Sequence, residues 1–374
     1  MEPNPELMAT MSRLLPPMTR LISLFIPGRD SRIAWQNAKN NADIIQLVAH
    51  VSAVLPPPGA EAPLFSLVEK CYALGTFPAL WAIEGLGHWY ADSFYQRNAG
   101  GAEEPRQLLT SPNAEGIPSK SLTMLHAGIG MSFAKRNLAT LKSSSPASEI
   151  RKAAEKVVEL CRNSSQPGYA GAAIESLGLA SRFLHGTKMV RALDEQLAQM
   201  GEKTGEDLVS YLWHGAGRAM YFSPPNFMPA WRTPWRAVEM CRTEPPHELG
   251  RRSAAAGFAW AITLVNMRFP IIMETLLKYH GEEFLKDDAF ANGVMSSLIM
   301  RYDITPDDSV LAAYRQHRPA ASDARVAELW ERLVRAPGEK ALTEIYPVLK
   351  ERQRIEEVFR YQDLAALAGA LRRS

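Results

Sequence analysis

The chain has 374 residues, 46% of them apolar and 22% charged, with a formal net charge of +2. This balance is typical of a folded protein with a large core and excludes a disordered chain. So small a net charge argues against a nucleic-acid-binding protein, because those carry a strong positive field. Three cysteines, Cys71, Cys161 and Cys241, are far apart and form no CxxC pair. We therefore expect buried thiols in a reducing, cytoplasmic setting.

The N-terminal segment reads LLPPMTRLISLFI at residues 14–26. Its apolar run is shorter than the core of a signal peptide, two prolines interrupt it, and no small-residue cleavage site follows. We predict an arm that packs onto the body, with peripheral membrane contact through residues 14–27 as the alternative. No stretch of the sequence reaches the roughly 20 uncharged residues of a transmembrane helix.

Helical periodicity dominates the rest of the chain. Apolar residues recur every three or four positions in 37–54 and 148–160, which predicts amphipathic helices there. Segments rich in proline, glycine and serine separate such stretches. We expect an N-terminal arm and first helix in 1–60, a helical repeat body in 61–322 and a C-terminal helical cap in 323–374.

A repeat appears when the segments that contain glycine are aligned. The spacings between successive aligned glycines are 43, 48, 39, 40 and 36 residues, close to the lengths of about 34 to 47 residues that are typical of two-helix repeats. The aligned positions are Gly87, Gly130, Gly178, Gly217, Gly257 and Gly293. The prediction is an all-α fold, a curved array of antiparallel helix pairs of the α-solenoid or toroid type.

Glycine inside a helix costs about 1 kcal/mol relative to alanine, so its repetition needs an offsetting gain. Close packing of backbones supplies one, since Gly130 and Ala134 lie four residues apart on one helical ridge. We expect the glycine helices to form an inner layer. The more charged partner helices, at 148–160 and 193–201, should form the outer layer.

Polar residues lie just before several of these glycines. Glu84, His126, Glu175 and His214 occupy nearly equivalent positions, which we place at the start of the inner helices. Converging carboxylates and imidazoles can act as general acid and base or bind a metal, although their spacing matches no metal motif. The alternative is that they satisfy free N–H groups at helix N-termini.

His88 follows Glu84 by four residues, so the two share a helical face and can form a hydrogen bond. A carboxylate that orients an imidazole is common in active sites and also in ordinary cores. The candidate catalytic residues are therefore Glu84, His88, His126, Glu175 and His214.

The segment 221–235 reads YFSPPNFMPAWRTPW. Its four prolines prevent a continuous helix and reduce the entropy lost when the loop is ordered. We predict a fixed apolar surface for a lipid-like or polyene ligand or a partner protein, with Arg232 available to bind a carboxylate. Its aromatic residues are Tyr221, Phe222, Phe227, Trp231 and Trp235. The alternative is a loop that caps a repeat.

Several motifs occur in a shared order along the chain. They are EG at Glu84, LHAGIGMSFAK around His126, an acidic residue with a later FxH at 175–185, GAGRAMYF at 215–222, AAGFAWA ending at Ala261, and IYPVLKER at 345–352. In this order they resemble a domain family of unknown function encoded in enediyne polyketide biosynthesis cassettes. Ser176 stands where that family often has glycine, and residues 1–55 match poorly.

The resemblance implies an accessory role in bacterial secondary metabolism. It brings no established reaction, catalytic residue or cofactor. Two functions follow as hypotheses. The first is an accessory protein that binds a partner protein or an apolar intermediate. The second is a tailoring enzyme with a His/Glu site, with or without a metal, in the helical array.

Overall fold

The computed structural model describes residues 29–56, 62–97, 105–110, 112–223, 235–320 and 323–373, together with Pro17 and Leu21. Every regular element in this part of the chain is a helix, which confirms the predicted all-α class. Except for Pro17 and Leu21, the predicted arm at 14–27 lies outside the described residues.

The chain divides into two compact units that cut across the domain ranges expected from the sequence. Unit 1 comprises Met1–Gln46, Gly217–Arg352 and Arg360–Ser374, and unit 2 comprises Leu47–Ala216 and Gln353–Phe359. Two helices cross the boundary along the chain, α2 (Arg29–Ala49) and α9 (Leu208–Tyr221). Helix α2 is the predicted first helix, and it begins at Arg29, eight residues before the position expected.

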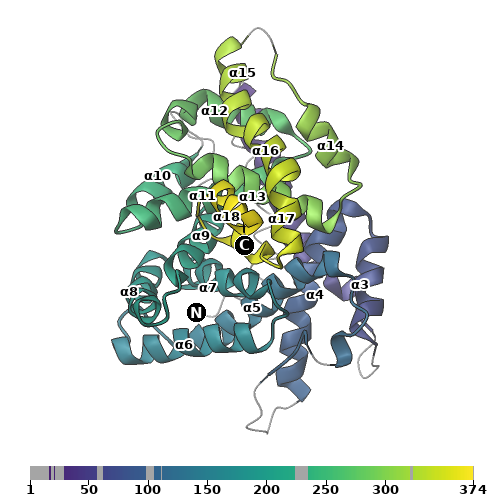
Figure 1. Ribbon diagram of the computed structural model, residues 1–374, viewed down its shortest axis with the longest axis vertical. Coiled ribbons are helices and arrows are strands. Elements are labelled where there is room, and N and C mark those ends of the chain that lie inside the picture. The colour runs from purple at the N-terminus through teal and green to yellow at the C-terminus, as the bar shows by residue number, and fades with distance from the viewer. Residues whose placement is uncertain are drawn as a thin grey trace. The chain divides into compact units, whose positions relative to one another are not determined.

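Unit 2 contains two layers of helices. The inner helices α4, α5 and α7 pack side by side in that order (Figure 1). The amphipathic helices α6 and α8 pack against α5 and α7 and against each other. The α-helices of this unit are α3 (Leu64–Ala73), α4 (Thr76–Arg97), α5 (Leu122–Leu138), α6 (Ala147–Asn163), α7 (Ala170–His185), α8 (Thr187–Thr204) and the first part of α9. Short 3₁₀ helices are η1 (His50–Ala53), η2 (Pro112–Ala114), η3 (Ser119–Ser121) and η7 (Ile355–Phe359).

The amphipathic pattern of the outer layer is borne out in α6. Its buried side chains are Ile150, Ala154, Val157, Val158, Leu160 and Cys161, which include every apolar residue that the periodicity placed on one face. Its charged residues, such as Glu155 and Glu159, are exposed. Helices α5 and α7, by contrast, are buried along most of their length.

Unit 1 is built around α11 (Glu248–Asn266) and α13 (Ala289–Ile304), which pack side by side and bury most of their residues. Around them lie α2, the end of α9, α10 (Arg236–Thr243), α12 (Pro270–Phe284), α14 (Ser309–Gln316) and α18 (Leu364–Arg373). A long helical run completes the unit, formed by α15 (Ala324–Trp330), η5 (Glu331–Arg335), α16 (Ala336–Lys340), η6 (Ala341–Ile345) and α17 (Tyr346–Glu351).

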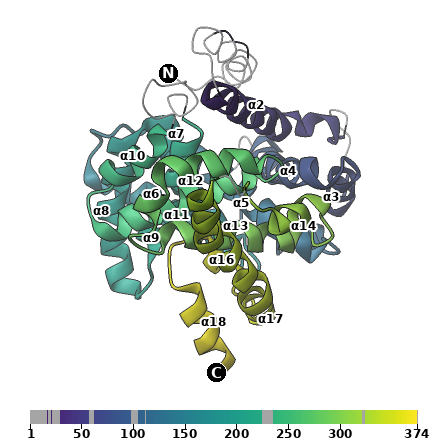
Figure 2. The same ribbon diagram turned by 90° about the horizontal axis from the view of Figure 1, so that it is seen from above.

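This run continues through two prolines that would ordinarily break a helix. A proline lacks an N–H group, and its ring collides with the carbonyl four residues earlier. Here η5 and η6 are π-helical turns, and each ends shortly before a proline, Pro337 or Pro347. The N–H group just before each proline bonds to the carbonyl five residues earlier, Ala336 to Glu331 and Tyr346 to Ala341, so the helical run continues into each proline through a π turn. Figure 2 shows α16 and α17 following one another in this run.

The inner helices approach one another at their glycines. In unit 2 a Cβ atom on Gly130 would lie 2.6 Å from the Ala173 Cα atom, and one on Gly87 would overlap the Leu125 carbonyl oxygen. In unit 1 a Cβ on Gly217 would lie 2.9 Å from the Ala254 Cα atom. Real Cβ atoms do not approach backbone so closely, so these crossings need glycine. The predicted inner layer of glycine helices is thereby confirmed.

Candidate functional site

Two of the predicted residues meet in unit 2. The Nδ1 atom of His214 on α9 lies 2.9 Å from Oε1 of Glu175 on α7, so the imidazole N–H donates to the carboxylate. Both side chains have 0% exposure. The contact depends on glycine, because a Cβ on Gly215 would overlap the Glu175 carbonyl and lie 2.7 Å from the Leu179 nitrogen. The close crossing of the two helices thus brings this acid–base pair together.

A second buried polar pair lies beside the first in sequence. The indole N–H of Trp213 donates to Oδ1 of Asp194 on α8 at 2.7 Å. Sequence reasoning missed this pair, because Asp194 lies in an amphipathic helix whose other acids, such as Glu195, are exposed. The sequence carried one indication of this pair, because Asp194 lies on the apolar side of α8, next to Leu193 and Leu197.

His126 is held by partners other than Glu175 and His214. Its Nδ1 atom lies 2.6 Å from the Leu122 carbonyl oxygen, and its Nε2 atom accepts from the backbone N–H of Gln166 at 3.1 Å. The ring stacks on Tyr169 with a centroid distance of 5.2 Å. Burial lowers the pKa of His126 to about 4, although the hydrogen bond to Leu122 acts in the opposite direction. Both ring nitrogens of this neutral histidine link backbone segments.

Glu84 and His88 lie on α4, and the acidic neighbour of His88 is Asp92. The Nε2 atom of His88 is 3.6 Å from Oδ2 of Asp92, and Oδ1 of Asp92 accepts a 2.5 Å hydrogen bond from the Ser132 hydroxyl. Burial lowers the pKa of His88, Asp92 raises it and Lys135 lowers it further. Ser132 thus bonds to the carboxylate of Asp92 and not to the imidazole of His88. In a Ser-His-Asp triad the serine bonds to the histidine, so this arrangement does not activate a serine nucleophile.

The predicted position of these residues within their helices is wrong. Glu84, His126, Glu175 and His214 lie beyond the first turns of α4, α5, α7 and α9, whose first residues are Thr76, Leu122, Ala170 and Leu208. Only the first four N–H groups of a helix lack an internal partner, so these side chains do not cap helix N-termini. The helices start earlier because the apolar residues before each polar one are also helical and buried, as in α4 from Ala79 to Ile83.

No group of three or more His, Cys, Asp or Glu side chains among the described residues has the arrangement of a metal site.

The aromatic segment 221–235 is described only at its ends. Phe227, Trp231 and Arg232 lie outside the described residues. Tyr221 is 0% exposed and Trp235 is 2% exposed, while Phe222 is half-buried. Tyr221 and Trp235 are therefore core residues and not the exposed apolar surface predicted at these positions. Tyr221 lies in the last turn of α9, where its ring meets Phe258 of α11 edge to face, and Trp235 immediately precedes α10.

The hydroxyl of Tyr221 is the centre of a buried hydrogen-bond cluster in unit 1. It donates to Oδ1 of Asn37 at 2.6 Å and accepts from the amides of Asn41 and Asn266 at 2.9 and 2.7 Å. Asn40 donates to Asn266 at 2.8 Å, which extends the cluster. Burial raises the pKa of Tyr221, so the hydroxyl remains a neutral donor. This cluster joins α2 to α9 and α11.

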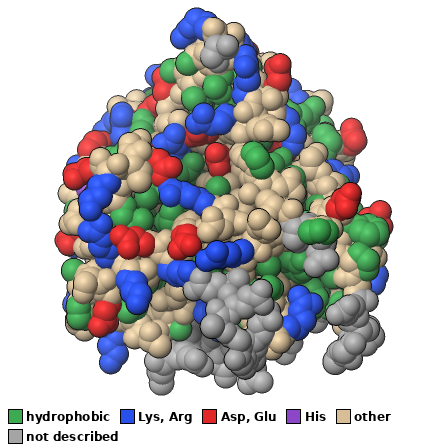
Figure 3. Space-filling view, turned by 60° about the horizontal axis from the view of Figure 1, so that its bottom comes forward, with side chains coloured by type: hydrophobic (Ala, Val, Ile, Leu, Met, Phe, Trp, Pro, Cys, Tyr) green, Lys and Arg blue, Asp and Glu red, His purple; other side chains and the backbone are tan. Residues whose placement is uncertain are grey.

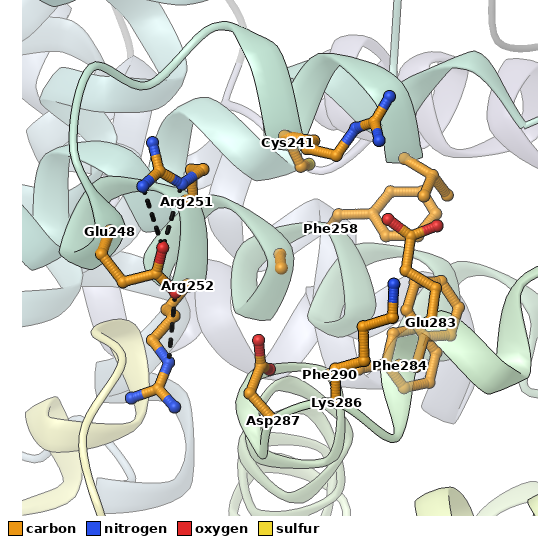
Figure 4. A pocket seen from close by; sticks show the side chains of 13 residues that line it. Cys241, Glu248, Arg251, Arg252, Phe258, Glu283, Phe284, Lys286, Asp287 and Phe290 are labelled. Atoms are coloured by element: carbon orange, nitrogen blue, oxygen red, sulfur yellow. Dashed lines mark hydrogen bonds and ion pairs between the residues drawn. The ribbon is translucent and has the colours of Figure 1, made fainter.

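A groove opens on the surface of unit 1, with a volume of about 260 Å³. That volume is close to the lower end of the range of about 300–1,000 Å³ for small-molecule sites. Its apolar lining comes from α10, α11, α12 and α13, and its charged lining from α10, α11, α12 and the turn after α12 (Figure 4). The apolar residues are Val238, Cys241, Ala255, Phe258, Phe284 and Phe290, and the charged ones are Arg242, Glu248, Arg251, Arg252, Glu283, Lys286 and Asp287.

Two stacked phenylalanine rings lie in the floor of the groove. Phe284 and Phe290 stack with a centroid distance of 4.0 Å and an interplanar angle of 8°. The Cys241 thiol donates a weak 3.4 Å hydrogen bond to the Ala254 carbonyl. Sequence reasoning missed the groove, because its phenylalanines fit ordinary helical periodicity and its lining comes from four helices.

On the face seen in Figure 3, Lys and Arg side chains are interspersed with Asp and Glu side chains. No helix in the described part of the chain has the length and apolar character needed to cross a membrane. Comparison of the chain with protein-family models, curated proteins and solved structures gave no match.

Proposed function

We propose that this chain is a noncatalytic accessory protein that holds a small apolar or amphipathic molecule in the groove of unit 1. The observation that supports this function is the contrast between two places in the chain. The groove is open to solvent and combines a floor of stacked aromatic rings with a charged rim, as small-molecule sites do. The best acid–base pair, Glu175 and His214, is closed to solvent.

The biological setting that we propose is bacterial secondary metabolism, in an enediyne-like polyketide pathway. The motifs spread from Glu84 to Arg352 are the support for it. Polyketide intermediates are extended and largely apolar, so an accessory protein that shields one from water suits a groove with an aromatic floor. An accessory protein of such a pathway can also bind a partner protein, which is the alternative occupant of the groove.

The test is native mass spectrometry of the chain purified from a bacterial host that makes polyketides. We expect a small-molecule adduct on the wild type. Ala255→Leu should lack the adduct, because the half-buried Ala255 lines the groove and a larger side chain would fill it. Equal melting temperatures would show that Ala255→Leu is folded. A wild type that carries no small molecule and instead co-purifies with a protein would replace the proposed ligand with a partner.

The second candidate function is an enzyme, and the 2.9 Å pair of Glu175 and His214 is the observation that favours it. A carboxylate that holds an imidazole by Nδ1 has the geometry of a general base. This function predicts that Glu175→Gln, which retains the shape of the side chain, abolishes conversion of a molecule carried by the wild type. Our proposal predicts that the wild type and Glu175→Gln both release that molecule unchanged.

A further inference from the structure

The charged side chains on the groove rim differ in whether a partner of opposite charge lies nearby. Glu248 pairs with Arg251 at 2.9 Å and with Arg252 at 3.8 Å, and Figure 4 shows these pairs on one side of the groove. Arg242 pairs with Glu239 at 2.6 Å. These three arginines therefore already have carboxylate partners.

The remaining acids of the rim also have partners. Glu283 lies 3.8 Å from the His280 ring, and Asp287 accepts a 2.9 Å hydrogen bond from the backbone N–H of Ala289. Lys286 differs from them. Of the cations that line the groove, it is the one for which the described residues supply no carboxylate within 4.0 Å.

Lys286 also lies next to the apolar floor. It follows Phe284 by two residues, and Phe284 stacks on Phe290. Figure 4 shows the Lys286 ammonium directed to the same side of the groove as Phe284 and Glu283.

Arg252 also lies 3.8 Å from Asp288, so the three arginines are balanced by Glu239, Glu248 and Asp288. Lys286 is left for a ligand, and Glu283 and Asp287 lie near it in the sequence and line the same groove. These acids repel a head group with one negative charge, such as a carboxylate, less than a phosphate monoester with nearly two.

From this juxtaposition we infer that the groove binds a small amphipathic carboxylic acid, with its carboxylate on Lys286 and its aliphatic or polyene chain against the phenylalanine floor. The inference rests on the proposed function and specifies its ligand class. It assigns the binding of the head group to a lysine just past the end of α12, at a position that belongs to no motif of the sequence. It also gives the direction in which the ligand lies, with the carboxylate at Lys286 and the chain over Phe284 and Phe290.

The test is calorimetric titration with three probes of equal chain length: octanoate, methyl octanoate and octylammonium. The wild type should bind octanoate more tightly than the ester and the ester more tightly than the amine. Lys286→Gln should weaken octanoate binding about two- to fivefold, the range of an exposed ion pair, and leave the ester unchanged. Added salt should weaken binding of octanoate and not of the ester.

Two further variants locate the site. Lys278→Gln is the matched control, because Lys278 is an exposed lysine of α12 that does not line the groove, and it should bind octanoate as the wild type does. Ala255→Leu should weaken both octanoate and ester at least tenfold. Its melting temperature checks that it remains folded.

Each contrary result has a distinct meaning. Equal binding of octanoate and ester, unchanged in Lys286→Gln, would overturn the carboxylate inference while the groove remained a binding site. Unchanged binding in Ala255→Leu would overturn the location. If the wild type bound none of the three probes, the ligand class would be wrong, and the adduct experiment would then decide the proposed function separately.

Discussion

Several buried polar side chains of this protein link their helix to other segments of the chain. His126 bonds to the Leu122 carbonyl of its own helix and to the backbone N–H of Gln166 between α6 and α7. His214 bonds to Glu175 on α7, and Tyr221 bonds to asparagines on α2 and α11. An unpaired buried polar group costs about 1–3 kcal/mol, so such partners hold the helices in one arrangement. Polar residues inside these glycine helices therefore have a structural effect before any chemical one.

Replacing Tyr221 by Phe should destabilise the protein by about 1–3 kcal/mol. The change removes a hydroxyl that serves Asn37, Asn41 and Asn266 while keeping the ring that packs near Phe258. Chemical denaturation measures the loss. Tyr279→Phe is the control, because Tyr279 is 39% exposed and its replacement should change stability by less than about 0.5 kcal/mol. Equal effects of the two changes would argue against the cluster.

His126 should make the protein less stable in acid. Its folded-state pKa of about 4 lies below the ordinary value of 6.5, so between these pH values the unfolded chain binds more protons than the folded one. The contribution of His126 to the free energy of unfolding is fully present above pH 6.5 and is lost as the pH falls to about 4. The loss between pH 7 and pH 4.5 should be roughly 2 kcal/mol larger in the wild type than in His126→Gln.

Denaturation curves of both proteins at the two pH values test this effect. The comparison is between pH dependences, so a general loss of stability in His126→Gln does not affect it. Burial also lowers the pKa of His88 and His280, and their contributions cancel because both proteins retain these residues. Identical pH dependences would contradict the assignment of a neutral buried His126.

The close contacts between the inner helices depend on small residues, which let two backbones approach each other. At Gly130 the backbones of α5 and α7 are so close that no side chain fits between them. This feature was predictable from the sequence, because glycines recur at the spacing of two-helix repeats and a helix does not retain them without a packing gain. The amphipathic pattern of α6 was predictable for the same reason, since periodicity reports which face is buried.

Gly130→Ala should therefore destabilise the protein by about 1–3 kcal/mol, because the added Cβ would lie 2.6 Å from Ala173 Cα and force α5 and α7 apart. Gly369→Ala is a matched control in α18. There the nearest atom to an added Cβ is Nη1 of Arg373 at 3.7 Å, and alanine favours the helix. Thermal melts should show a loss for the first variant and no loss for the second. A neutral Gly130→Ala would contradict the close contact.

Helix ends were less predictable than helix faces. The sequence placed Glu84, His126, Glu175 and His214 at helix starts, whereas each helix begins a turn or more earlier. Tyr169 before α7 gives no side-chain cap, so that start had no local signal. Asp207 before α9 was a signal that the prediction did not use, because its carboxylate accepts from the Ser210 backbone N–H at 3.0 Å. The continuation of the helical run through Pro337 and Pro347 could not be predicted either, because a π turn leaves no simple pattern in the sequence.

Across the whole chain, the class of fold was predictable and the place of the groove was not. Helical periodicity is a local property that one sequence reveals, but the groove needs Phe258, Phe284 and Phe290 to meet from three helices. The pairing of Glu175 with His214 was foreseen as a convergence, although not its complete burial. The aromatic segment misled the prediction at Tyr221 and Trp235, since large aromatic residues are more often core than surface.

The location of the bound acid tests the account most directly. Photoaffinity labelling with a diazirine analogue of octanoate, followed by peptide mapping, reports which residues the ligand touches. We predict labelled peptides within 238–258 and 283–290, with labelling suppressed by excess octanoate and lost in Ala255→Leu. Specific labelling confined to peptides that contain Glu175 and His214, or to 221–234, would contradict the account and place the ligand at the buried pair or in the aromatic segment.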